Sequence, residues 1–285
     1  MKRLACALPL LLTACALGCA FVCKETKLQQ VRTQERIPML KGFMTTYHNR
    51  TFLVLVAAFT LLIVGFQLVM GFSNFTTIFY LFRGDKAAAS TLMAQNGTLW
   101  AAVGIAGVFP MVWLSKAFGK RTTVILSFAL IATGNLLKIL CYDPSYPWLT
   151  FIPTCCLSLG MVFCFSLVNS MISDICDEEE LRTGTRREGI YFAVYNWWWK
   201  VGVSIAAVLS GYLLRLTGFS EGMATQDAAV MFWIRFWEIG LPSALCLVSI
   251  YLLTKYPLTE ERAYQVKEIL AARRAGAKGH LDAAS

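Results

Sequence analysis

Long runs without a charged residue are the feature that most limits what this chain can fold into. Residues 51–82, 87–115 and 144–173 contain no Lys, Arg, Asp or Glu. About 18 consecutive apolar residues distinguish a membrane-spanning helix from a buried helix of a soluble protein. The composition agrees, because 57% of the residues are hydrophobic and only 15% are charged, against about 45–50% and about 25% in soluble domains. The chain is therefore predicted to be an all-α, polytopic membrane protein.

Seven membrane spans are predicted from these runs. Each is long enough to cross about 30 Å of hydrocarbon, since a helix rises about 1.5 Å per residue. We expect the helix bundle to occupy residues 1–257 and residues 258–285 to form a tail. The spans lie near residues 4–23, 52–74, 97–115, 122–141, 148–173, 190–214 and 229–254.

Basic residues gather on one side of these spans. Residues 24–50, 115–121, 174–189 and the tail from 255 hold 18 of the 26 Lys and Arg residues, whereas the opposite side holds six. Cytoplasmic loops of membrane proteins carry such an excess. We therefore expect a multi-pass protein of the cell (inner) membrane with a cytoplasmic C-terminus and an N-terminus outside. The net charge of +9 then reflects topology, and no nucleic-acid partner is expected.

The first segment admits a second interpretation. Lys2 and Arg3 precede a short apolar stretch, as in a signal peptide, and LTAC at 12–15 resembles a lipoprotein cleavage box. Cleavage there would place the basic residues of 24–50 outside, against the pattern of the other loops. We therefore interpret residues 4–23 as a span. Basic residues at an outer N-terminus are then explained if the natural chain begins upstream.

The chain offers little for catalysis. His48 and His280 are its two histidines, and neither falls in a predicted span. Histidine-based acid–base chemistry or a histidine metal site inside the bundle is therefore not expected. No Walker sequence, GxGxxG or nucleophile elbow occurs, and the ten cysteines lack zinc-site spacing. We predict that the protein is not an enzyme and holds no catalytic residue, metal or cofactor.

A stripe of small and polar residues runs along the span 190–214 and contains a lysine. A lysine at membrane depth needs a carboxylate, a carbonyl or water beside it. Snorkelling to an interface is the alternative, but Lys200 lies ten or more residues from either end of the span, too far for its side chain. We predict that Asn196, Lys200 and Ser204 line a transport pathway or neighbour a cation site. The stripe consists of Gly189, Ala193, Asn196, Lys200, Ser204, Ala207 and Gly211.

Two further spans carry polar stripes. Gln67 and Asn74 share a face of the span 52–74, and Asn169 lies on a polar face of the span 148–173. A single polar side chain in lipid more often holds helices together than binds a ligand. Three polar faces in one bundle favour a shared polar cavity, so Gln67, Asn74 and Asn169 are predicted to line the pathway.

The segment 174–189 concentrates charge between two spans. Its sequence, DICDEEELRTGTRREG, places five acids before Arg182 and a Thr-Gly-Thr turn at its centre. A solvated surface loop is the simplest interpretation. Its acids and arginines are also close enough to pair, and breaking such pairs is one way in which a cytoplasmic gate opens. The gate residues predicted on this basis are Asp174, Asp177, Glu180 and Arg186.

Other charged or amphipathic segments are given structural roles. Arg235 and Glu238, three residues apart near the outer end of the last span, are expected to pair with each other. Residues 36–50 fit either a short amphipathic helix on the inner surface or an ordinary basic linker. Residues 259–270 are predicted to form a charged helix, followed by a disordered Ala- and Gly-rich end.

The charged segment also resembles the signature of a known family. The pattern DxxDEEELRTGTRREG, followed by an apolar helix with Lys200 eleven residues after Gly189, is similar to the sequence between helices ten and eleven of the melibiose permease family. These proteins are the glycoside-pentoside-hexuronide:cation symporters of the major facilitator superfamily. Shorter motifs agree across essentially the whole chain, namely FVCKE at 21–25, FGKR at 118–121 and KYPLTEER at 255–262.

The resemblance implies a fold and roles for several residues. Family members have twelve helices in two halves, and the seven spans look like helices six to twelve. Lys200 matches the helix-eleven lysine near the cation site, and Asp174, Asp177 and Arg186 match the charged inner gate. The acidic residues that hold the coupling cation in the N-terminal half of such symporters have no counterpart here.

We therefore predict secondary active transport of a sugar or glycoside across the lipid bilayer. Transport would occur by alternating access, would be coupled to Na⁺ or H⁺, and would be performed by a truncated or partial transporter. A second chain that supplies the missing N-terminal helices is one way to complete it. A non-transporting membrane protein, either a remnant or a partner-binding subunit, is the main alternative, and an integral membrane enzyme is the third.

Overall fold

The computed structural model describes residues 2–22, 39–220, 223 and 226–282, and the chain divides into two compact units, Met1–Lys41 and Gly42–Ser285. The first unit contains the helix α1 (Lys2–Val22). The apolar stretch found within α1, Leu12–Val22, is too short to count as a full membrane span. The expected span at 4–23 therefore stays a prediction.

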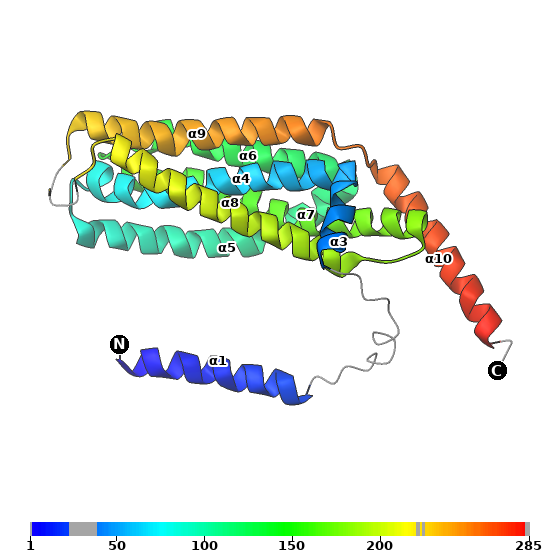
Figure 1. Ribbon diagram of the computed structural model, residues 1–285. Coiled ribbons are helices and arrows are strands. Elements are labelled where there is room, and N and C mark those ends of the chain that lie inside the picture. The colour runs from blue at the N-terminus through cyan, green and yellow to red at the C-terminus, as the bar shows by residue number, and fades with distance from the viewer. Residues whose placement is uncertain (1, 23–38, 221–222, 224–225, 283–285) are drawn as a thin grey trace. The chain divides into compact units, whose positions relative to one another are not determined.

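The described part of the chain is built from helices alone (Figure 1). After α1 come α3 (Met39–Tyr47), α4 (Arg50–Phe75), the π-helix η1 (Thr76–Leu81), α5 (Lys86–Phe118), α6 (Lys120–Cys141), the 3₁₀-helix η2 (Pro147–Thr150), α7 (Phe151–Thr183), α8 (Glu188–Leu216), α9 (Ala228–Thr254) and α10 (Glu260–Asp282). Within the described residues, six of these segments are long and apolar enough to cross a membrane. The all-α polytopic fold is confirmed.

Two helices extend well beyond their predicted spans. α5 begins at Lys86 because the Asp85 carboxylate caps it, accepting hydrogen bonds from the amides of Ala87 (3.0 Å) and Ala88 (3.1 Å). α7 continues through Thr183 and ends at Gly184, whose φ of 74° suits a residue without a Cβ. Most of the predicted loop 174–189 is thus helical. That prediction was wrong because hydropathy marks where hydrocarbon ends, whereas Glu, Leu and Arg readily continue a helix into water.

Close helix contacts hold the bundle of the second unit together. α4 packs against α8 and α9, α6 packs against α7 and α9, and α5 packs mainly against α7. A Cβ on Gly160 of α7 would lie 2.5 Å from a side-chain carbon of Ile131 on α6, so only glycine allows that approach. Gly65 of α4 similarly lies against the backbone of Pro242 in α9. α5 and α8 are the least buried of the six spans.

The amphipathic segments at the N-terminal and C-terminal sides of the bundle are both helical. α3 favours the helix over the linker as the interpretation of 36–50, and its Phe43 ring meets Trp197 of α8 edge-on at 5.4 Å. α10 leaves the end of α9 at an angle to the bundle (Figure 1). It runs to Asp282, so the expected disorder after residue 270 was wrong over this range. Alanine, a strong helix former, is frequent in that stretch.

Candidate functional site

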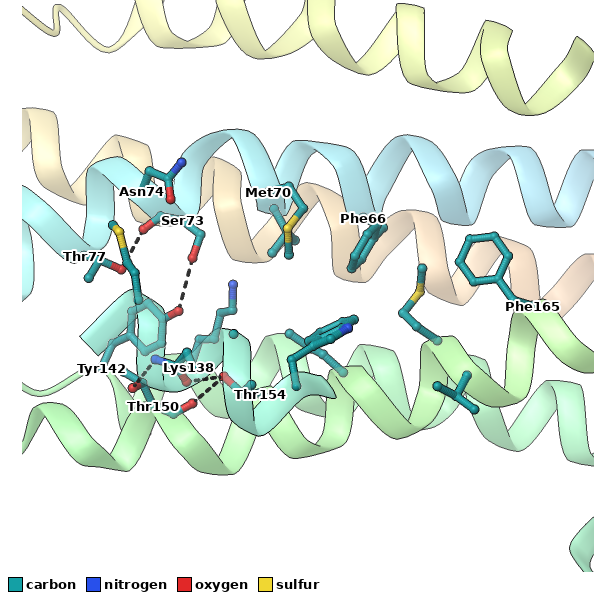
Figure 2. A pocket seen from close by; sticks show the side chains of 18 of the residues that line it. Phe66, Met70, Ser73, Asn74, Thr77, Lys138, Tyr142, Thr150, Thr154 and Phe165 are labelled. Carbon is teal, nitrogen blue, oxygen red and sulfur yellow. Dashed lines mark hydrogen bonds between the residues drawn. The ribbon is translucent and has the colours of Figure 1, made fainter. Parts of the chain in front are cut away.

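A cavity of about 680 Å³ lies between α4, α5, α6 and α7, lined by the second half of α4 and the first half of α7. Its volume is in the range of small-molecule sites. Hydroxyl and amide groups line it from two sides, as Figure 2 shows for Ser73, Asn74 and Thr77 on one side and Tyr142, Thr150 and Thr154 on the other. Aromatic rings complete the walls, namely Phe66, Trp100 and Phe165.

Asn96 fixes one wall of this cavity. Its amide nitrogen donates to the Thr150 hydroxyl at 3.2 Å, and its amide oxygen accepts from the Thr154 hydroxyl at 2.8 Å. Both amide ends therefore have partners on η2 and α7, and α5 is held to that side of the bundle. Asn96 lies outside the predicted span 97–115, so the sequence did not mark it as a pathway residue.

A buried ion pair closes the cavity on the side of α6 and α9. The Lys138 amine on α6 lies 2.7 Å from a carboxylate oxygen of Glu238 on α9, and the two side chains are 3% and 0% exposed. The Thr76 hydroxyl donates to the other carboxylate oxygen. Lys138 also lies 5.5 Å from the ring centre of Tyr142, whose hydroxyl is 3.5 Å from that of Ser73.

Glu238 is thus paired with Lys138, and the expected Arg235–Glu238 pair was wrong. The Arg235 guanidinium instead lies over the Tyr80 ring, 4.1 Å from its centre. An i, i+3 spacing only permits a pair, whereas a carboxylate buried at membrane depth requires a cation that is buried with it. Lys138 meets that need because α6 and α9 pack side by side. The sequence did contain a signal for this pair. Lys138 lies late in the span 122–141 and Glu238 lies early in the span 229–254, so the two opposite charges were predicted near the same side of the membrane.

The predicted pathway residues occupy different places. Asn74 lines the cavity. Gln67 is half-buried on α4 and Asn169 is exposed on α7, and neither lines it.

Asn196, Lys200 and Ser204 lie on an exposed face of α8, apart from the cavity. Two of them bond to their own helix: the Asn196 amide donates to the Phe192 carbonyl at 2.8 Å, and the Ser204 hydroxyl donates to the Lys200 carbonyl at 3.0 Å.

The predicted gate residues form two neighbouring clusters near the other end of the bundle. Arg186 bonds Asp177 at 2.8 Å, Glu180 at 3.2 Å and Glu188 at 2.9 Å. Burial opposes the charge on Arg186, but its hydrogen bond with Glu188 and the nearby carboxylates raise the pKa of the guanidinium above its ordinary value. The structure thus brings Asp177, Glu180 and Arg186 together.

Asp174 belongs to the second cluster. One of its carboxylate oxygens lies 2.5 Å from the Lys120 amine at the start of α6, and the other lies 2.6 Å from the Lys267 amine on α10. The Glu260 carboxylate accepts from the Lys120 backbone amide at 2.6 Å. α10 is therefore tied to α6 and α7 by ionic and hydrogen-bonded contacts.

Comparison with known proteins gives this architecture a family. A family profile described as "MFS/sugar transport protein" matches residues 4–260. The chain belongs to this family and is a multi-pass membrane protein of the major facilitator superfamily. The resemblance drawn from the charged signature is confirmed.

Individual relatives carry symporter and carrier names. An uncharacterized symporter of Synechocystis sp. is 26% identical over 84% of this chain and 44% of its own length. An Escherichia coli protein named provisionally as a sulfoquinovose importer is 25% identical over 86% of this chain and 51% of its own. A glucuronide carrier protein homolog of E. coli is 22% identical over 86% and 52%. The chain spans about half the length of the curated relatives it matches.

Proposed function

We propose that the chain takes part in secondary active transport of a sugar or glycoside, coupled to Na⁺ or H⁺ and working by alternating access. Membership of a sugar-transport family supports this proposal. Relatives named as symporters and as a glucuronide carrier homolog support it further.

The cavity between α4 and α7 is the observation that carries the proposal. A sugar ring has apolar C–H faces and a rim of hydroxyl groups, so a matching site needs flat apolar walls and hydrogen-bonding groups at their edges. Phe66 and Trp100 supply such walls, with ring centres 5.9 Å apart. Ser73, Asn74 and Asn96 supply hydrogen-bonding groups beside them.

The exposed face of α8 is proposed to line the same pathway from a second side. Asn196, Lys200 and Ser204 are too polar to face lipid, because polar and charged groups at membrane depth need polar surroundings. We propose that this face meets further helices across a wet pathway, with Lys200 beside the cation. A chain that supplies N-terminal helices is one possible source of them.

The clusters around Asp174 and Arg186 are proposed to form the cytoplasmic gate, with the C-terminus on the same side of the inner membrane. Their partners come from α6, α7, α8 and α10, so a relative movement of these helices would break several pairs at once. The excess of basic residues at this end supports the orientation.

Sugar binding by the purified full chain tests the proposal. Equilibrium dialysis against a panel of radiolabelled neutral and acidic glycosides, with and without Na⁺ and at two pH values, should identify a ligand. Trp100→Ala should weaken its binding by roughly tenfold or more, because about 1.4 kcal/mol of lost apolar contact corresponds to that factor. Trp148→Ala is the matched control, since Trp148 is 58% exposed and lies outside the cavity.

Two outcomes would contradict the proposal. The cavity would not be the sugar site if Trp100→Ala and Trp148→Ala weakened binding equally. Failure of the folded chain to bind any glycoside in the panel would favour the non-transporting alternative.

A further inference from the structure

A second hollow, of about 850 Å³, opens on the surface of the bundle between η1, α6 and the first turns of α9. Its walls include large apolar side chains that protrude from the protein, among them Leu136 and Ile139 of α6 and Phe232 and Phe236 of α9. In a membrane-spanning bundle such exposed apolar side chains face the hydrocarbon of lipids. We refer to this hollow as the α6–α9 groove.

Two arginines lie in this apolar groove. Arg83 follows η1 and is exposed, and Arg235 is half-buried on α9. Among the described residues no carboxylate forms an ion pair with either of them. Within the described ranges, the Arg235 guanidinium makes one long hydrogen bond, 3.4 Å to the Ile139 carbonyl, and its buried Nε has no partner. Within the part of the chain that the structure describes, the groove thus contains two positive charges that form no ion pair.

The Tyr80 ring orients Arg235. The guanidinium carbon lies over this ring, 4.1 Å from its centre, and this cation–π contact holds the charge at the wall of the groove. Planar, forked N–H donors match two oxygens of a phosphate group.

The depth of Arg235 places it near the boundary between hydrocarbon and headgroups. α9 has 27 residues, or about 40 Å at about 1.5 Å per residue, so it exceeds about 30 Å of hydrocarbon by roughly 5 Å at each end. Arg235 lies seven residues after the first residue of α9, which is about 10 Å along the axis. Phe232, Trp233, Phe236 and Trp237 form a chain of ring contacts around it, as expected of an interfacial aromatic belt.

We propose that the α6–α9 groove binds an anionic phospholipid from the leaflet at this end of the bundle. The phosphate lies between Arg83 and Arg235, and an acyl chain lies along Leu136, Ile139 and Phe236. The phosphate gives the two arginines an anionic partner, and the apolar wall accounts for a lipid and not a soluble phosphate. This inference is independent of the proposed transport function.

Native mass spectrometry of the full chain, released from detergent with added lipids, tests the site. Phosphatidylglycerol and phosphatidylcholine with identical acyl chains are the probes, because they differ in net charge. The wild-type chain should retain phosphatidylglycerol preferentially. The double variant Arg83→Gln/Arg235→Gln should lose about tenfold or more of that preference, since charge-assisted contacts to phosphate are removed.

A charge-matched control distinguishes lipid binding in the groove from general electrostatic attraction of an anionic lipid to a positively charged protein. Lys86→Gln/Arg215→Gln also removes two exposed positive charges at this end of the bundle but none that lines the groove, and it should keep the preference. Arg235→Lys keeps the charge without the flat guanidinium and should give an intermediate preference, even if the double variant fails to fold.

Three results would overturn the inference. They are equal retention of the two lipids by the wild-type chain, equal losses in the two double variants, and complete displacement of the lipid by free inorganic phosphate. The last result would mean that a soluble anion, and not a lipid, is the ligand.

Discussion

The two ends of the bundle use ion pairs in contrasting ways. At the cavity end Lys138 and Glu238 are 3% and 0% exposed and join α6 to α9 out of reach of water. At the other end the cations are more exposed, 39% for Arg186 and 45% for Lys267, whereas their partners Asp177 and Asp174 are 14% and 6% exposed. The chemistry is the same, but the surroundings differ. Both partners of the cavity-end pair are shielded from water, whereas each of these pairs at the other end has a cation that water reaches.

The energetic reason for the contrast lies in desolvation. Removing one partner of a buried pair leaves an uncompensated charge and costs about 3–5 kcal/mol. An exposed pair exchanges its partner for water, so breaking it costs about 0–1 kcal/mol. If the contrast is correct, variants at the cavity end should strongly affect the stability of the fold, whereas variants at the other end should affect it much less.

The largest effect is expected at Lys138. Lys138→Met should lower the unfolding free energy by about 3–5 kcal/mol, because Glu238 remains buried without its cation. The double variant Lys138→Met/Glu238→Leu should recover most of that loss, since no buried charge remains. Reversible unfolding of the purified chain in detergent micelles, followed by tryptophan fluorescence, would measure both values.

The two single variants and the double variant form a double-mutant cycle, which tests whether the two charges interact. Losses from Lys138→Met and Glu238→Leu that simply add up in the double variant would mean that the two charges do not interact. If Lys138→Met lowered the unfolding free energy by less than about 1 kcal/mol, the buried pair would contribute no more than an exposed pair, and the contrast between the two ends would not hold.

The sequence predicted the helices better than it predicted this pair. Charge-free runs indicated the six spans of the second unit because each span must be apolar over about 20 residues. The pairing of Lys138 with Glu238 depends on α6 lying beside α9, and no local spacing records which helices pack together. The helical end of α7 was missed for a similar reason, since water accepts a charged helix as readily as a charged loop.

The candidate site shows the same limit. The stripe on α8 was visible because its small and polar residues repeat with helical spacing, and the structure places Asn196, Lys200 and Ser204 on one exposed face. The cavity between α4 and α7 was only partly visible, through Asn74. Its other polar residues are single hydroxyl and amide groups on separate helices, and only the packing of those helices brings them together.

A smaller effect is expected for Arg186 and should depend on salt. Arg186→Gln should lower the unfolding free energy by about 0–1 kcal/mol at low salt, and the loss should shrink in about 1 M salt, where the Debye length is about 3 Å. The loss caused by Lys138→Met should persist in the same salt, because a buried pair is poorly screened. Unfolding curves of both variants at the two salt concentrations would compare the two ends directly. A salt-independent loss for Arg186→Gln would show that this cluster is buried when the chain is in its micelle.

The smallest effect is local and concerns how α10 is held. Burial opposes the charge on Lys267, but its hydrogen bond with Asp174 and the negative charge of that carboxylate outweigh this and raise the pKa of the amine above its ordinary value of 10.5. A raised pKa means that the pair stabilises the docked α10 fully below the ordinary pKa and that this contribution is lost as the pH rises through the higher, folded-state pKa. Hydrogen exchange in α10, after correction for the intrinsic pH dependence of exchange, should therefore be slow below the ordinary pKa of 10.5 and accelerate only as the pH rises through the higher, folded-state pKa of Lys267. Lys267→Arg should keep its protection over the same range, because a guanidinium stays protonated there, and Lys267→Gln should lack it at every pH. Identical profiles for the wild-type chain and Lys267→Gln would mean that contacts other than this pair hold α10 against α6 and α7.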